Sequence, residues 1–199
     1  FDVWGMDVSR FGDWATRLYT NAKVQENYSR RFSIRFPNEE LPAGRPLRTT
    51  PIYDKLIAQG AIMGESFGLE VPLWFAPKGV EDHFSWRRST DFEHIATEVK
   101  AVRQGVGLLE ISGFAKYSIV GSGAADWLDN ILACRIPKPG RMTLAPMLNQ
   151  KGKLIGDFTL SNIDSEEFYL VGSGIAEEYH LRWFEANLKE HLPETEEVQ

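Results

Sequence analysis

The sequence predicts an α+β fold, a mainly antiparallel sheet with helices on one face, preceded by an irregular α/β connecting region. Two observations lead to this fold class. From residue 114 onward, stretches with strand periodicity and stretches with helix periodicity follow in the order strand, helix, three strands, helix. A turn signal at residues 149–152 joins two of these strands as a hairpin, and hairpins form antiparallel pairs. Helices that cover one face of such a sheet make a two-layer α+β domain.

The first 90 residues give mixed signals. We expect a helix over residues 13–28 and a strand over residues 32–36, where apolar and polar residues alternate. A short helix should follow over residues 50–60, because Thr50 and the proline after it form a typical helix start. Glycine and proline recur over residues 64–82 and predict loops and turns there.

The rest of the chain is regular. Apolar residues spaced three and four apart indicate helices, and apolar residues spaced two apart indicate strands. The expected helices cover residues 91–104, 124–133 and 176–188, and the expected strands cover residues 114–120, 141–148, 153–163 and 167–172.

The composition excludes several classes of protein. The chain has 199 residues, of which 43% are hydrophobic and 25% charged, which is typical of a globular protein. The net charge of −6 provides no general attraction to nucleic acid or to an anionic membrane. No apolar run approaches the roughly 20 residues of a membrane span. Because Cys134 is the only cysteine and the histidines lack metal-ligand spacing, we expect no metal site.

Asp157 is the candidate functional residue that the strand pattern indicates. Alternation places Leu154, Phe158 and Leu160 on the apolar face of strand 153–163 and Asp157 on the other face. Aspartate is depleted in strands. Spacing alone leaves two interpretations open: a solvated strand surface, or a carboxylate that lines a cleft and holds a cationic or N–H-bearing ligand group.

Eight motifs resemble known families. The motifs of the second half resemble the folate-binding aminomethyltransferase domain of the glycine cleavage system: GLLEIS (107–112), GSGAA (121–125), LNQKGKLIGDF (148–158) and YLVGSG (169–174). The motifs of the first half resemble the connecting region of the dimethylglycine and sarcosine dehydrogenase family: ENYSRRF (26–32), FPNEELP (36–42), RTTPIYD (48–54) and GLEVPLWFAP (68–77). The chain is therefore identified as a fragment of that dehydrogenase family. Residues 1–80 would be the connecting region after a flavin domain, and residues 81–199 the N-terminal part of the folate-binding domain.

The resemblance implies a function and a set of site residues. In this family a flavin domain oxidises an N-methyl amino acid, and the folate domain captures the one-carbon unit on tetrahydrofolate. Asp157 matches the family's acid/base residue, and Leu144, Val171 and Ser173 match the surroundings of the pterin ring. Tetrahydrofolate is thus the implied cofactor, with FAD expected only in the missing N-terminal domain. The chain departs from the glycine-cleavage pattern at Gly156, where an acid is usual, and at Ser173, where an asparagine is usual.

The implied partners are a small-molecule one-carbon donor and the rest of the parent chain, with no nucleic acid and no membrane. We also expect a homo-oligomer, because a sheet cut halfway leaves unpaired edges. The expected location is the cytoplasm, or the mitochondrial matrix if the source is eukaryotic. Two alternatives stay open: a folate-dependent aminomethyl- or methyltransferase without flavin oxidation, and a non-catalytic module that braces neighbouring domains.

Overall fold

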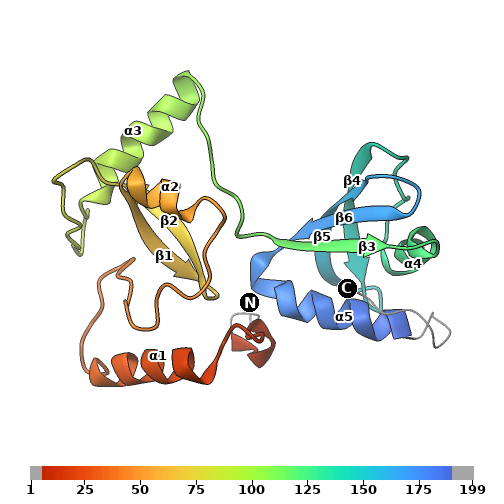
Figure 1. Ribbon diagram of the computed structural model, residues 1–199, viewed down its shortest axis with the longest axis horizontal. Coiled ribbons are helices and arrows are strands. Elements are labelled where there is room, and N and C mark those ends of the chain that lie inside the picture. The colour runs from red at the N-terminus through yellow and green to blue at the C-terminus, as the bar shows by residue number, and fades with distance from the viewer. Residues whose placement is uncertain (1–5, 190–199) are drawn as a thin grey trace. The chain divides into compact units, whose positions relative to one another are not determined.

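The computed structural model describes residues 6–189, and the chain divides into two compact units. One unit comprises residues 13–113, and the other comprises residues 1–12 together with 114–199. Each contains its own antiparallel sheet (Figure 1). The sequence places a boundary near residue 80, between the connecting region and the folate-binding domain. That boundary stays a prediction.

The second unit confirms the predicted α+β architecture. Its elements are η2 (Val8–Arg10), β3 (Ala115–Val120), α4 (Ala124–Ile131), β4 (Arg141–Leu148), β5 (Leu154–Asn162), β6 (Glu167–Gly172), η3 (Gly174–Ala176) and α5 (Glu177–Lys189). The strands form an antiparallel sheet in the order β3-β6-β5-β4. The turn before β5 is the predicted hairpin turn, in which the Asn149 side chain accepts hydrogen bonds from the backbone N–H groups of Lys151 and Lys153.

One face of this sheet is buried under the two helices. Trp127 and Leu128 of α4 and Phe184 of α5 pack against Phe158 and Leu160 of β5. The whole buried cluster comprises Ala115, Tyr117, Ala124, Trp127, Leu128, Ile131, Leu132, Ala145, Met147, Phe158, Leu160, Phe168, Leu170 and Phe184. The opposite face of the sheet is therefore the one that carries exposed side chains.

The predicted orientation of Leu154 is wrong. Its side chain is 63% exposed, whereas the neighbouring Ile155 packs against the core. The reason is a register shift: β4 pairs Leu148 with Leu154 but pairs Met147 with Gly156, so one residue of β5 bulges. A one-residue slip moves side chains to the opposite face of a strand.

The first unit differs from the sequence prediction in three places. Its elements are α1 (Arg17–Ser29), α2 (Tyr53–Ala58), β1 (Ala61–Ser66), β2 (Leu69–Phe75) and α3 (Asp91–Gln104). The predicted helix start at Thr50 is wrong, because the helix begins at Tyr53 after Ile52 as its N-cap residue, without a side-chain cap. The strand expected over residues 32–36 is absent from this described segment, and residues expected to form loops make the β1–β2 hairpin. The hairpin turn consists of Phe67 and Gly68, both at positive φ, a backbone conformation typical of two-residue hairpin turns.

A buried ion pair stabilises this hairpin. Arg45 donates two hydrogen bonds to the Glu70 carboxylate, at 2.6 and 2.7 Å, and a third to the backbone oxygen of Met63. Glu70 is 2% exposed. Next to it, Glu65 accepts a hydrogen bond from Tyr19 and forms an ion pair with Lys23 of α1. Arg45 thus forms an internal ion pair with a carboxylate of the β1–β2 hairpin.

Candidate functional site

Asp157 lies on the open face of the second unit's sheet. Its partner on β4 is Pro146, and its neighbours along the strand, Gly156 and Phe158, face the core. The Asp157 side chain is exposed. None of the described side chains forms a hydrogen bond or an ion pair with its carboxylate, so among them both oxygens are available to a ligand.

The register brings the other predicted residues around Asp157. Leu144 of β4 and Val171 of β6 are both paired with Thr159, two residues along the strand from Asp157. Such diagonal neighbours lie about 7–8 Å apart, within reach of long side chains. Ser173 follows the last β6 residue in extended conformation, and continuing the register would place it opposite Asp157. All four residues predicted from the sequence thus share one region of the sheet.

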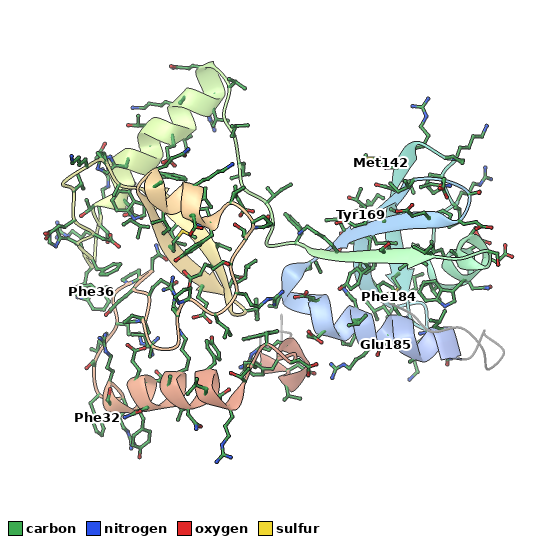
Figure 2. All side chains as sticks on the ribbon, in the orientation of Figure 1. Phe32, Phe36, Met142, Tyr169, Phe184 and Glu185 are labelled. Atoms are coloured by element: carbon green, nitrogen blue, oxygen red, sulfur yellow. The ribbon has the colours of Figure 1, made fainter. Side chains whose placement is uncertain are left out.

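The surroundings of Asp157 on this face are largely apolar. Leu144 is 66% exposed and Met142 is 70% exposed, and Tyr169 of β6 is 37% exposed. Figure 2 shows Met142 and Tyr169 on the opposite side of the sheet from Phe184, which lies between the sheet and α5. A carboxylate beside exposed apolar side chains suits a flat ligand that has an apolar ring face and N–H groups at its edge.

His180 of α5 lies behind Asp157, on the buried side of the strand. It is 2% exposed, and its Nε2–H donates a hydrogen bond of 3.0 Å to the backbone oxygen of Ile155. A Cβ added at Gly156 would lie 2.6 Å from Nε2. Gly156, the departure from the usual acid, is therefore explained by the histidine ring that occupies the space of a side chain.

Burial lowers the pKa of His180 from 6.5, although the hydrogen bond to Ile155 and the charge of Asp157 act in the opposite direction. The ring is thus neutral near neutral pH. Sequence reasoning considered this histidine only as a metal ligand and missed its packing. A glycine inside a strand was the available signal, because such a glycine often marks a close approach by another group.

Three further findings concern the described residues outside the surroundings of Asp157. A hollow of about 300 Å³ lies between the end of α4, the hairpin turn after β4 and α5, and Asp157 is not among its lining residues. Within residues 6–189, no group of three His, Cys, Asp or Glu side chains is arranged to hold a metal ion. No helix in the same range is long and apolar enough to cross a membrane.

Two family models match the chain. Residues 52–199 match the GCVT N-terminal domain, and residues 1–50 match the FAD dependent oxidoreductase central domain. The mitochondrial dimethylglycine dehydrogenase of Mus musculus is 35% identical over 187 residues, 93% of this chain. A mitochondrial pyruvate dehydrogenase phosphatase regulatory subunit of Mus musculus is 27% identical over 96% of this chain. The chain spans only 22% of the length of each of these two relatives.

A solved structure has a similar fold. It is the glycine cleavage system aminomethyltransferase T of Bartonella henselae, with a TM-score of 0.50 and 19% sequence identity over 71% of this chain and 35% of that protein. At this identity the likeness concerns the fold alone. The sequence matches extend further, since the GCVT model covers more than half of the chain. The chain therefore belongs to the GCVT N-terminal domain family, in the group that includes the dimethylglycine and sarcosine dehydrogenases.

Proposed function

We propose that residues 81–199 form part of the folate-binding surface of a demethylating enzyme, which transfers a one-carbon unit from an N-methyl amino acid to tetrahydrofolate. The observation that carries the proposal is the exposed Asp157 carboxylate on the same sheet face as Leu144 and Val171, which flank Thr159 two residues along the strand. The similarity to dimethylglycine dehydrogenases and the match to the GCVT N-terminal domain support it. FAD belongs, in this proposal, to a separate flavin domain of the parent protein.

The residues of the open face fit a reduced folate in chemical character. The Asp157 carboxylate can accept hydrogen bonds from ring N–H groups and can take up a proton as an amine nitrogen reacts. Leu144 and Val171 offer apolar contacts to a ring face, and Ser173 offers a hydroxyl at the edge. Tetrahydrofolate supplies the nucleophilic amine nitrogens that accept the one-carbon unit. The protein's part is to orient the ring and to exchange the proton at Asp157.

The test uses the intact parent enzyme with Asp157→Asn. The fold should persist because the change is nearly isosteric and the Asp157 side chain is exposed. Loss of a positioned acid/base group typically costs about 10²–10⁴-fold in rate. Methylene-tetrahydrofolate should therefore fall by that factor. Substrate oxidation continues, and water hydrolyses the iminium product to the demethylated amine and formaldehyde, so free formaldehyde should rise.

Glu167→Gln is the matched control. Glu167 is an exposed carboxylate on the same sheet face, six register positions or roughly 20 Å from Asp157 along the strands. It should leave both products unchanged. If Asp157→Asn makes methylene-tetrahydrofolate at the wild-type rate, Asp157 is an ordinary surface residue and the proposal fails.

A second candidate function is a non-catalytic regulatory module. The observation that favours it is the similarity to a protein named as a phosphatase regulatory subunit, which extends over 96% of this chain. Equilibrium dialysis of the intact parent protein with tetrahydrofolate separates the two functions. Measurable binding that Asp157→Asn weakens supports the enzyme, and an absence of binding by the folded parent protein supports the regulatory module.

A further inference from the structure

We propose that His180 is a positioning residue for Asp157. On this view the histidine ring holds the β-bulge that precedes Asp157 and thereby sets the direction of the carboxylate on the open face. The argument that His180 positions Asp157 uses only the geometry of the second unit. The expected effect on folate binding rests on the proposed function.

The backbone just before Asp157 leaves the regular ladder. Because β4 pairs with Leu154 and then with Gly156, Ile155 has no paired residue on β4. On the other side, the β5–β6 pairing begins at Thr159, and the chain turns into η3 after β6. Ile155 is therefore unpaired toward β4, and the whole segment from Ile155 to Asp157 is unpaired toward β6. Bulges of this kind bend a strand and redirect its side chains.

His180 supplies the contact that the ladders lack. Its Nε2–H donates to the Ile155 carbonyl oxygen at 3.0 Å. The same ring occupies the space that a side chain at Gly156 would need. Its centroid lies 4.8 Å from the centroid of the Phe158 ring. The residues on both sides of Asp157 along the strand thus contact one ring. Fixing both neighbours on the buried side directs the Asp157 side chain to the opposite face.

The geometry also accounts for the state of the ring. His180 is buried, and its Nδ1 has no hydrogen-bond partner among the described residues. In a neutral ring with the proton on Nε2, the unpartnered Nδ1 is an uncharged acceptor, whereas a charged ring would bury a positive charge and a second N–H without an acceptor, which costs more. The neutral Nε2–H form is therefore the one that both the burial and the Ile155 bond favour.

The experiment compares three variants of the 199-residue chain by backbone amide hydrogen exchange. His180→Leu removes the donor, and His180→Gln keeps an N–H group near the Nε2 position. Tyr117→Phe is the matched control, since it deletes a buried hydrogen bond to the backbone oxygen of Glu177 on the same helix. The amides of residues 156–158 report on the bulge, and the amide of Leu170 reports on the core of the sheet.

We expect His180→Leu to speed exchange at residues 156–158 at least tenfold more than at Leu170. His180→Gln should restore exchange to within about threefold of wild type, and Tyr117→Phe should affect both regions equally. If His180→Leu speeds exchange equally in both regions, His180 only contributes to the stability of the core, and the proposal is overturned. If His180→Leu does not fold, ¹⁵N NMR of the His180 ring in the wild type tests the proposal instead. A proton on Nδ1 rather than Nε2 would contradict the hydrogen bond to Ile155.

The tetrahydrofolate affinity of the intact parent protein links the inference to the proposed function. His180→Leu should weaken binding at least tenfold, whereas His180→Gln and Tyr117→Phe should stay within about threefold of wild type. Unchanged binding by a folded His180→Leu chain would overturn the role in positioning. If the wild-type parent protein does not bind tetrahydrofolate, the proposed function fails, and the exchange experiment still decides the role of His180.

Discussion

Gly156→Ala should destabilise the second unit although it adds a single methyl group. The new Cβ would lie 2.6 Å from Nε2 and 3.1 Å from Cε1 of His180, and 3.1 Å from the Phe158 ring. Overpacking of this kind costs about 1–3 kcal/mol. If the ring moves away, its buried bond to Ile155 is lost as well, at about 1–3 kcal/mol. The free energy of unfolding should therefore fall by about 1–3 kcal/mol if the ring stays in place, and by up to about 6 kcal/mol if the bond to Ile155 is lost too.

Gly123→Ala is the matched control for this prediction. Gly123 has φ −93°, and a Cβ there would meet no atom within 4 Å. The same substitution should thus change the free energy of unfolding by about 1 kcal/mol or less, with stabilisation as the expected direction. Urea unfolding, followed by tryptophan fluorescence and far-UV circular dichroism, measures both variants.

A double-mutant cycle identifies the cause. In a His180→Ala background the ring is gone, so Gly156→Ala should cost much less than in the wild type, with a coupling of about 0.5–3 kcal/mol. The reasoning is refuted if Gly156→Ala is no more destabilising than Gly123→Ala, or if its cost is the same with and without the His180 ring.

Three further predictions concern pH, the first unit and association. Because burial lowers the pKa of His180 from 6.5, the folded state binds its proton less readily than the unfolded chain does. The free energy of unfolding should be level above pH 6.5 and fall below it by at most about 1.4 kcal/mol per pH unit, and His180→Gln should abolish that part of the dependence in urea titrations at several pH values. Glu70→Gln leaves the Arg45 guanidinium, whose side chain is 12% exposed, without its buried carboxylate, so the first unit should lose about 3–5 kcal/mol in urea unfolding; a loss below about 1 kcal/mol would mean that the pair behaves as a surface pair. Met142 and Leu144 are at least 66% exposed on the open sheet face, so sedimentation should show concentration-dependent association that Leu144→Lys reduces, and a constant monomer mass would contradict this.

The regular elements of the second unit could be predicted because their signals are local. Residues 141–148 and 167–172 form strands with the predicted bounds, and residues 91–104 of the first unit form the predicted helix. Even there, periodicity did not decide burial: Val99 and Val102 are 47% and 60% exposed, although both lie on the apolar side of the helix. The choice of Asp157 also required only local information, since an aspartate within an alternating strand is unusual wherever the strand lies.

Tertiary structure decided what depends on a partner distant in sequence. Residues 32–36 alternate like a strand but pair with no strand of the described residues 6–189, whereas residues 61–75, where loops and turns were expected in part, form a hairpin. The bulge at Ile155 moved Leu154 to solvent, and Gly156 is explained only by His180, which follows 24 residues later. Periodicity indicates only which side chains of one segment share a face. Register, bulges and the filling of a glycine's empty space are set by the contact between two segments, and one segment alone does not encode them.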